Sequence, residues 1–510
     1  MKRALAILVF VALVVPPMGT AGAASTHVFR GGGWGHGVGG SQYGMYGLAQ
    51  KGWGRDRIIR QYYRDTTVET KGSPVDDFRI GLLQNRGTFT FKVLQGSLTF
   101  KLDSGTEIQT LSAGQTRRVE IRNRKYRIYN GSKLVGDQAW GSKTNHLRVV
   151  RNAGGVIHVN QWGHAISQGP RMELNIISNT RAHLVALIPP DPYLYGLAEV
   201  PSSWPAKVLQ IQAILGRTYA FEKIGRVGNN RSGCNCGLYA TTADQHYTGW
   251  TKESGAGGGG WVASVEATAG LVVTHNGKPI QAYYSSSSGG MTDSSAVVWG
   301  GSFPYLRKAC DPGDYTGANP NRTWSLKLSD TSAASRLRNR FGWNIARVTQ
   351  IKVLDRGAGG YIDRVRVRGK KSGGGDATFT TSGENLRIGL SLKSSRVWIN
   401  ANRQVTGAIR NHYDGLNCKP GLPRSARTGA RGGEWQRFVK GRIYSKSRPG
   451  THWIHGPTLT RYLKLKGPNG RLRYPKTGVQ RISDGRDRVI FQKGRIICKR
   501  STGSCNVKYT

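Results

Sequence analysis

Short alternating runs of apolar and polar residues fill the chain from Asp77 to about Tyr195, and turn-forming Gly, Asn and Ser residues separate them. A two-residue period over four to eight positions is typical of β-strands with one buried face. The runs are FRIGLL, TFTFKVL, SLTFKL, RRVEIR, YRIYN, HLRVV, GVIHVN and LNIIS. This region is therefore predicted to consist of strands and hairpins.

A helical period follows in AKVLQIQAILGRTYAFEKIG, residues 206–225, with Pro205 in the first turn and Ser203 as the predicted cap. Its apolar stripe runs through Leu209, Ala213 and Ala220. The neighbouring face carries Val208, Leu215 and Tyr219, and Gln212 interrupts this otherwise apolar series. Arg217 lies one turn from both faces, so Gln212 and Arg217 are predicted to orient a ligand.

Further elements alternate after this helix. WVASVEATAG (261–270) predicts a second, shorter helix, and LVVTHNG and IQAYYSSSSGG predict strands. A strand-rich stretch extends from Trp324 to Asn400. The fold class is therefore predicted to be α+β, with a β-rich core and a short-helix region that carries the site.

The C-terminal region repeats itself. FVKGRIYSK (438–446) recurs as FQKGRIICK (491–499), with GRLRYPKTG between the copies, which indicates duplication of a small β unit. The segment before it, PGLPRSARTGAR (420–431), has the composition of a linker. We therefore predict a core over residues 25–409, a linker over 410–431 and a separate module over 432–510.

The first residues have the features of a secretory signal peptide. A positive start precedes an apolar run, residues 4–15, and the small residues AGA follow at 21–23. Residues 1–24 are therefore predicted to be removed on export, and no later stretch is apolar for long enough to span a membrane.

Six cysteines in an exported chain predict three disulfides. Cys498 and Cys505 are expected to close a hairpin. The others, Cys234, Cys236, Cys310 and Cys418, allow three connectivities. Cys234 and Cys236 together with His246 raise the alternative of a metal site, but the spacing is unlike that of structural zinc sites, so we expect a disulfide, no bound metal and no cofactor.

The net charge of +47 indicates attraction to polyanions. Outside the membrane these are phosphate-rich wall polymers, anionic lipids and peptidoglycan carboxylates rather than nucleic acid. The basic residues are spread along the chain, so a generally basic, solvated surface is an equal alternative to a specific polyanion site.

The run GGGWGHGVGGSQYG contains the pattern G-x-G-x-x-G at residues 35–40. A dinucleotide site needs a buried strand before the glycines and an acidic residue about 20 positions later. Only Asp56 and Asp65 lie near that position, so we expect no nucleotide. The glycines instead allow close backbone approach, Ser41 is expected to cap a helix that reaches about Gly47, and the predicted sugar-binding side chains are Trp34, His36, Gln42 and Tyr43.

An acid that cleaves polysaccharide must stay protonated near neutral pH, and burial among apolar neighbours achieves this. Glu173, Glu199 and Glu266 have apolar flanks. Glu199 is the preferred candidate because a loop and a proline-started helix follow it, a position from which a side chain turns into a cleft. The alternative is a structural carboxylate.

A second polar cluster lies in AYYSSSSGGMTDSSAVVWGG. In a strand, Tyr284, Ser286 and Ser288 share one face and are predicted to bind sugar hydroxyls, with Trp299 stacking on a ring. No G-x-S-x-G motif surrounds these serines, so serine hydrolysis is not expected.

The chain resembles the SpoIID/LytB family of bacterial wall-acting proteins over about residues 27–408. The resemblance is carried by YLYGLAEVPSSWPAKVLQIQAILGRTYA (193–220), GLYATTADQHYTGW (237–250), the segments 270–301 and 304–314, and GWGHGVGGSQYGMYGLAQKG (33–52). It implies a lytic transglycosylase that cleaves peptidoglycan glycan strands with Glu199, or a LytB-type enhancer of a wall amidase. The C-terminal units resemble, more weakly, the LGFP repeats of actinobacterial wall proteins, which implies wall attachment.

Three departures from the family pattern stand out. GWGHGVG (33–39) usually follows the last strand of the family but here precedes the first, within a relocated segment of residues 27–66, and the site stays intact only if the two ends of the domain meet. Val200 and Pro201 replace the usual Met-Pro after the glutamate, and the cysteine pattern is shortened to Cys234-Asn235-Cys236.

Beside a lytic transglycosylase and an amidase enhancer, a polyanion-binding structural protein is the third alternative for the function. The oligomeric state stays open.

Overall fold

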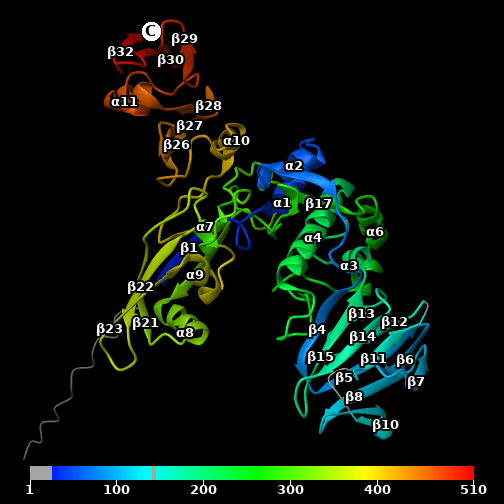
Figure 1. Cartoon of the computed structure of the whole chain (residues 1–510). Coiled ribbons are helices and arrows are strands. Elements are labelled where there is room, and N and C mark those ends of the chain that lie inside the picture. The colour runs from blue at the N-terminus through cyan, green and yellow to red at the C-terminus, as the bar shows by residue number, and fades with distance from the viewer. Residues whose placement is uncertain (1–25, 140–144, 153) are drawn as a thin grey trace, which may run out of the picture.

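The computed structural model describes residues 26–139, 145–152 and 154–510 (Figure 1). The predicted signal peptide, residues 1–24, lies outside these ranges. The described chain forms a β-sandwich, a smaller α+β lobe, a helical region between these two, and a C-terminal module. Within the described ranges, no helix is both long and apolar enough to cross a membrane.

The sandwich confirms the predicted strand region. Its first sheet has the order β16 (Leu238–Tyr239), β4 (Phe78–Arg86), β15 (Ala182–Ile188), β14 (Arg171–Ile176), β11 (Leu147–Arg151), β6 (Ser97–Leu102) and β7 (Glu107–Ser112). The second has the order β10 (Lys133–Ala139), β9 (Lys125–Asn130), β8 (Thr116–Arg122), β5 (Thr88–Gln95), β12 (Val156–Val159) and β13 (His164–Ile166). Alternate residues of both sheets fill one core, where the rings of Phe91 and Phe100 meet edge to face with centroids 5.8 Å apart.

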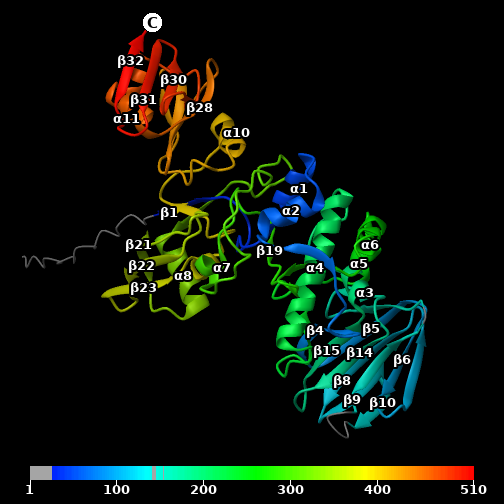
Figure 2. The ribbon, with the colours of Figure 1, turned by 45° about the horizontal axis from the view of Figure 1, so that its top comes forward.

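The predicted long helix is α4 (Ala206–Val227), which runs from the sandwich to α1 and α2 (Figure 2). Pro205 occupies the cap position and no side chain caps the helix, so the expectation that Ser203 is the cap was wrong. The helices around it are α3 (Pro190–Tyr195), α5 (Trp250–Glu253) and α6 (Gly258–Glu266). The last of these confirms the second predicted helix, although it begins three residues earlier.

The relocated N-terminal segment supplies α1 (Gln42–Gln50) and α2 (Arg55–Tyr62), which pack against α4. Ser41 caps α1 as expected, its hydroxyl accepting a hydrogen bond from the Gly44 N–H at 3.2 Å. Short elements complete this region: β2 (Gly40–Ser41), β3 (Thr67–Thr70), β17 (Leu271–His275), β18 (Lys278–Pro279), β19 (Tyr284–Ser285) and α7 (Ser295–Trp299).

The serine-rich segment is mostly irregular. Only Tyr284 and Ser285 form a strand, paired in parallel with Gly40 and Ser41 of β2. The predicted strand over residues 280–290 was therefore wrong, and its alternation of faces does not hold. The two consecutive glycines that follow, Gly289 and Gly290, both have positive φ and turn the chain away from extended geometry.

The smaller lobe contains two three-stranded sheets. One has the order β20 (Trp324–Ser329), β1 (Thr26–Gly31) and β24 (Val397–Ile399), and the other β21 (Arg347–Val353), β22 (Arg364–Lys370) and β23 (Asp376–Ser382). Since β1 is the central strand, with Phe29 opposite both Leu326 and Ile399, the two ends of the domain meet in space as the relocation requires. Two helices, α8 (Asp330–Phe341) and α9 (Gly383–Leu390), were not predicted.

The C-terminal module consists of two similar four-stranded antiparallel units. The first contains β25 (Thr428–Ala430), β26 (Gly433–Phe438), β27 (Gly441–Lys446) and β28 (Gly450–Ile454), and the second β29 (Gln480–Ile482), β30 (Arg486–Phe491), β31 (Gly494–Lys499) and β32 (Cys505–Tyr509). α11 (Gly456–Lys464) and the short helix Gly467–Asn469 connect the units. Phe438 pairs with Gly441 as Phe491 pairs with Gly494, so the repeated sequence corresponds to a repeated structural unit, as predicted.

The predicted linker, residues 410–431, is folded. It begins within α10 (Gly407–Gly415) and ends after β25, which pairs with β26. Pro423 bridges Phe438 as Pro475 bridges Phe491, so this proline-rich segment is the first copy of the repeat motif. Tyr413 of α10 also stacks on Phe438 at 5.2 Å, which joins the module to the core.

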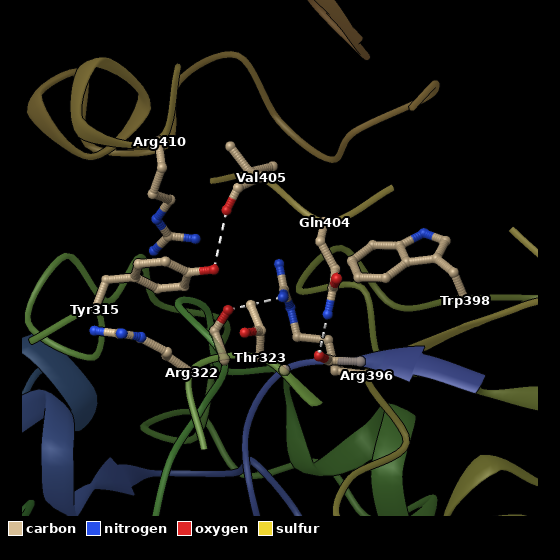
Figure 3. A pocket seen from close by; sticks show the side chains of 11 residues that line it. Tyr315, Arg322, Thr323, Arg396, Trp398, Gln404, Val405 and Arg410 are labelled. Atoms are coloured by element: carbon tan, nitrogen blue, oxygen red, sulfur yellow. Dashed lines mark hydrogen bonds between the residues drawn. The ribbon is translucent and has the colours of Figure 1, made fainter. Parts of the chain in front are cut away.

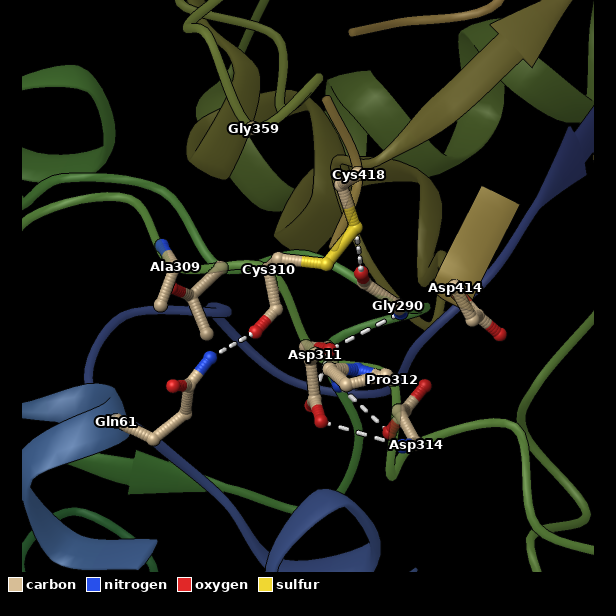
Figure 4. The surroundings of a disulfide bond; sticks show 12 residues. Gln61, Gly290, Ala309, Cys310, Asp311, Pro312, Asp314, Gly359, Asp414 and Cys418 are labelled. Carbon is tan, nitrogen blue, oxygen red and sulfur yellow. Dashed lines mark hydrogen bonds between the residues drawn. A yellow bond between two sulfur atoms is a disulfide. The ribbon is translucent and has the colours of Figure 1, made fainter. Parts of the chain in front are cut away.

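The six cysteines form three disulfides, as predicted. Cys498 and Cys505 close the β31–β32 hairpin, and the remaining pairs are Cys234–Cys236 and Cys310–Cys418. The last pair joins the loop before Asp311 to the segment after α10 (Figure 4). It therefore anchors the junction between core and module covalently.

Candidate active site

Glu199 lies where the chain leaves α3 and approaches α4. A bridge between Leu197 and Tyr247 holds this segment against the loop that follows β16. The Ala198 N–H donates to the His246 carbonyl at 2.8 Å, and the His246 N–H donates to Oε1 of Glu199 at 2.6 Å. The carboxyl is therefore fixed by backbone geometry.

Burial raises the pKa of the Glu199 carboxyl to about 7. Desolvation is the largest cause, because the charged form loses more hydration than the neutral form. Hydrogen bonds from the His246 N–H and the Tyr284 hydroxyl favour the carboxylate and oppose part of this shift. A carboxyl with this pKa exchanges a proton readily near neutral pH, which suits general acid and base catalysis.

A chain of buried polar groups orients the Tyr284 hydroxyl. Tyr193 donates to Oε1 of Gln245 at 3.1 Å, and Nε2 of Gln245 donates to the Tyr284 oxygen at 2.8 Å. Because that oxygen accepts from Gln245, its own hydrogen is free to point at Glu199. The predicted residue Tyr284 thus contacts the candidate acid directly.

Gln42 and Gln212 meet beneath Glu199. Nε2 of Gln42 donates to the Glu199 carbonyl at 3.1 Å and to Oε1 of Gln212 at 3.2 Å. Gln212 is fully buried. The polar residue that interrupts the apolar face of α4 therefore positions the Glu199 backbone through Gln42.

The glycine-rich loop passes close to other backbone. Gly37 has a φ of +72°, and a Cβ there would lie 1.9 Å from the Tyr361 ring. A Cβ on Gly39, at a φ of +70°, would lie 2.1 Å from the Tyr283 carbonyl. Only glycine fits at these two positions. The loop is preceded by β1, which is antiparallel to both neighbours, unlike the parallel βαβ unit of a dinucleotide site.

An aromatic wall, defined here as His36, Tyr283 and Trp299, flanks Tyr284, and Trp34 bridges Ser287 in the same glycine-rich loop. The His36 ring centroid lies 4.9 Å from Trp299 and 6.2 Å from Tyr283. Trp34 and Trp299 are 51% and 41% exposed, unusually open for tryptophan. Burial lowers the pKa of His36 to about 4, so its ring is neutral at physiological pH. A neutral aromatic surface of this kind can stack on a sugar ring.

A second aromatic pair lies beside Gln42. The Tyr43 ring is 5.1 Å from Trp204, which follows Glu199 in the loop before α4. The Tyr43 N–H donates to the Ser286 carbonyl at 3.0 Å. The structure brings together Tyr43 and Ser286, two residues predicted in separate clusters, and Trp204 is an additional residue of this surface.

Three predicted residues have structural partners instead. The guanidinium of Arg217 makes five hydrogen bonds, to Asp191 and to carbonyls before β17, and so fastens α4 to its neighbours. The buried Ser288 hydroxyl donates to Asp311 at 2.7 Å. The Tyr219 hydroxyl donates to Asp244 at 3.0 Å. Intramolecular partners occupy the polar atoms of Arg217 and Ser288, and ligand binding by these residues stays a prediction.

The other two candidate glutamates have different surroundings. Glu173 lies in β14 and forms ion pairs with Arg79 at 2.8 Å and Arg171 at 3.5 Å. Glu266 is exposed at the end of α6, where it accepts from Tyr195 at 3.4 Å. Neither combines burial with an orienting hydroxyl, so Glu199 is the stronger candidate.

A buried carboxylate pair supports the site from behind (Figure 4). Asp314 accepts from Ser41 at 3.0 Å and from Ser287 at 3.0 Å, while Asp311 accepts from Tyr62 at 2.8 Å. Burial raises the pKa of both carboxyls. This network joins the cap of α1 to the serine-rich segment and so holds the relocated segment in register with the site.

Sequence reasoning gave no role at the Glu199 site to Gln245, His246, Trp204 or Tyr283, and considered His246 only as a metal ligand. The first two lie in TTADQHYTGW, whose polar residues give no periodic signal. Trp204 was visible as an aromatic between two prolines, directly after the candidate acid. Tyr283 was assigned to the far face of a strand that does not form.

Two protein-family models match segments of this sequence. Residues 178–275, which include Glu199 and α4, match the model described as Stage II sporulation protein (SpoIID), and residues 421–470 match the LGFP repeat. The chain carries a SpoIID domain and an LGFP repeat. The LGFP match begins inside the predicted linker, in agreement with the pairing of Pro423 and Phe438.

This chain has bacterial proteins among its curated relatives. It is 34% identical over 155 residues to the amidase enhancer of Bacillus subtilis (strain 168), covering 30% of this chain and 19% of that protein. It is 23% identical over 269 residues to stage II sporulation protein D of Bacillus amyloliquefaciens, covering 47% of this chain and 77% of the relative. The same protein of Bacillus subtilis is 21% identical over 273 residues. The chain thus spans about a fifth of the amidase enhancer.

Proposed function

We propose that the protein is an exported lytic transglycosylase that cleaves peptidoglycan glycan strands, with Glu199 as its acid and base. The observation that carries the proposal is the half-buried Glu199 carboxyl, which accepts the His246 N–H at 2.6 Å and whose pKa desolvation raises to about 7. The relatives named for sporulation and amidase enhancement, and the LGFP repeat, support a role at the bacterial cell wall.

The reaction begins with protonated Glu199. It donates its proton to the glycosidic oxygen between N-acetylmuramic acid and N-acetylglucosamine as the C1–O bond breaks. The resulting carboxylate then accepts the proton of the muramyl C6 hydroxyl, whose oxygen attacks C1 and closes a 1,6-anhydro ring. No water is consumed, and Glu199 regains its proton. One carboxyl suffices because the nucleophile belongs to the substrate, whereas hydrolases that activate water use two.

The neighbours of Glu199 fit both steps. The His246 N–H and the Tyr284 hydroxyl stabilise the carboxylate formed in the first step. The raised pKa that results from burial then favours reprotonation of Glu199 in the second step. The aromatic wall on one side, and Tyr43 with Trp204 on the other, provide surfaces on which successive sugar rings stack. The glycan strand would therefore lie across Glu199 between the two aromatic groups.

The decisive experiment compares wild-type protein and Glu199→Gln on purified sacculi. Intact sacculi and sacculi stripped of stem peptides are digested separately, and the sugar ends are identified by mass spectrometry. We expect 1,6-anhydromuramyl ends from the wild type alone. Reducing ends would indicate hydrolysis, and no cleavage of either substrate would contradict the proposal.

A second candidate function is enhancement of a wall amidase without cleavage of glycan. The 34% identity to the amidase enhancer favours it. Its test adds Glu199→Gln protein to a purified N-acetylmuramoyl-L-alanine amidase acting on sacculi. Stimulation of stem-peptide release by this variant, together with absence of anhydro ends from the wild type, would favour enhancement over catalysis.

A further inference from the structure

Buried cations of this protein fasten backbone segments by donating to carbonyl oxygens. Arg396, for example, donates from Nε to the Gly359 carbonyl at 2.9 Å and from Nη1 to the Gly289 carbonyl at 2.8 Å (Figure 3). Lys252 of α5 makes a contact of the same kind, and its acceptor belongs to the residue that directly follows Glu199. The position of this lysine therefore connects it to the candidate acid.

The Lys252 side chain is almost fully enclosed. It is 8% exposed, its Nζ donates to the Val200 carbonyl at 2.6 Å, and the same Nζ lies 5.1 Å from the centroid of the Trp261 ring. The adjacent Glu253 is directed elsewhere, since its carboxylate accepts from the Ser167 hydroxyl at 3.1 Å. Burial lowers the pKa of the Lys252 ammonium to about 8, so the charged form still predominates at neutral pH.

Two successive carbonyls of the Glu199 segment accept from side chains of other segments. Nε2 of Gln42, in α1, donates to the Glu199 carbonyl at 3.1 Å. Lys252, in α5, donates to the next carbonyl, that of Val200. Pro201 follows, and its ring fixes φ at that residue. The backbone directly after the candidate acid is therefore held from two helices.

The chain before the candidate acid is held separately. Nε1 of Trp261 donates to the Leu194 carbonyl at 2.9 Å. The Thr248 N–H donates to the Gly196 carbonyl at 2.8 Å. These contacts do not involve the Lys252 ammonium, so its loss would release only the part of the segment that follows the acid.

We propose that Lys252 is a positioning residue for Glu199, which it keeps aligned with the His246 N–H by holding the Val200 carbonyl. That N–H lies 2.6 Å from Oε1 of Glu199. A catalytic group has to stay within about 0.5 Å of its productive position, so a released backbone would weaken this hydrogen bond. The role rests on the function proposed for Glu199, but the alignment itself can be measured without turnover.

Lys252→Met removes the donor and the charge and keeps an unbranched side chain that can pack on the Trp261 ring. Once the Val200 carbonyl is released, the Glu199 carboxylate loses part of the hydrogen bonding that favours it, and the pKa of Glu199 rises further. Lys252→Arg keeps a charged donor and should preserve the wild-type value. A residue that only stabilised the fold would change the melting temperature and leave this pKa unchanged.

The first experiment measures the pKa of Glu199 in the full chain by nuclear magnetic resonance of carbon-13-labelled glutamate carboxyls, with Glu199→Gln as the assignment. We expect Lys252→Met to raise this pKa by about 0.5–1 and Lys252→Arg to leave it unchanged. The matched control is Lys446→Met, because Nζ of Lys446 donates to the Arg431 carbonyl at 3.0 Å and lies 5.5 Å from the Tyr474 ring, in the C-terminal module. An equal pKa in wild type and Lys252→Met would overturn the proposal.

A further variant keeps this test decisive if Lys252→Met fails to fold. Lys252→Gln ends one atom earlier than lysine, so its amide falls short of the Val200 carbonyl while the side chain stays polar. It should raise the pKa of Glu199 in the same direction. An unchanged pKa in this variant would overturn the proposal equally.

The second experiment measures cleavage of soluble glycan fragments. Lys252→Met should lower kcat about tenfold and change KM less than about twofold, because it touches no substrate. The basic limb of its pH profile should move to higher pH, and Lys252→Arg should restore both properties. Lower activity with an unchanged pH profile would overturn the proposal. Wild-type protein that cleaves no glycan would instead reject the function proposed for Glu199, and the resonance titration would still decide the role of Lys252.

Discussion

The side-chain amide of Gln245 donates to the Tyr284 hydroxyl oxygen at 2.8 Å, and this contact decides where the tyrosine hydrogen points. Gln245 is fully buried and is itself held by Tyr193 and by the Gly216 carbonyl. Its orientation is therefore fixed, and Tyr284 is left to donate to Glu199. A residue that touches no substrate thus controls the hydrogen bonding of the candidate acid.

Tyr284→Phe removes a hydrogen bond that favours the Glu199 carboxylate, so the pKa of Glu199 should rise above about 7. The basic limb of the pH–rate profile for glycan cleavage should then move to higher pH, and the maximal rate should fall about tenfold because the carboxylate is less stabilised. Gln245→Leu should give the same direction of change. An unchanged pH profile in both variants would remove Tyr284 from the site.

Glu199→Gln should abolish anhydromuramyl products and should also stabilise the protein at high pH. In the wild type the folded pKa of about 7 exceeds 4.5, the ordinary pKa of a glutamate. Glu199 therefore makes its full contribution to the free energy of unfolding below about pH 4.5. At most about 3 kcal/mol of that contribution is lost as the pH rises through 7. Melting temperatures from pH 5 to 8 test this.

The matched control for that measurement is Glu266→Gln, at an exposed position. The difference in melting temperature between Glu199→Gln and the wild type should widen from pH 5 to 8, whereas the control should follow the wild type. A constant difference would mean that Glu199 titrates normally.

Trp34→Ala should lower the rate of glycan cleavage about tenfold, equivalent to about 1.4 kcal/mol of lost stacking. Because the Trp34 side chain is 51% exposed, folding should be unaffected. His36→Ala should weaken cleavage in the same way by removing the ring between Trp299 and Tyr283. Addition of NAD should leave the melting temperature unchanged, and a stabilising shift would restore the nucleotide hypothesis.

Deletion of residues 421–510, which removes both repeat units together with Pro423 and β25, should lower retention on sacculi at low salt, where attraction between the module's basic residues and anionic wall polymers would be least screened. The deletion also removes the Phe438 ring on which Tyr413 stacks, so some loss of thermal stability is expected. Cleavage of soluble glycan fragments should change little. Loss of that cleavage in a folded truncation would make the module part of the catalytic unit.

Much of the sandwich was predictable because one buried face per strand produces a two-residue period. Glu199 was found because its apolar neighbours leave it half-buried and desolvate its carboxyl. The module boundary was misplaced because proline and glycine were interpreted as a linker, while Pro423 makes a bridge that only the second copy at Pro475 could have revealed. α8 was overlooked although Ser329 caps it and Ala333 and Leu337 are buried along its length. The long-range contacts of Gln245 and His246 have no local signal.

The central position of β1 has a consequence for the order of folding. Its two partners, β20 and β24, are separated from it by about 300 and 370 residues of chain. The first strand of the described chain therefore remains without its complete sheet until nearly four-fifths of the polypeptide has been synthesised. Contacts this distant slow folding. For the export that we propose, a chain that stays open at this strand for so long would suit a translocation channel, which accepts only unfolded polypeptide, and the lobe would close after the chain has crossed.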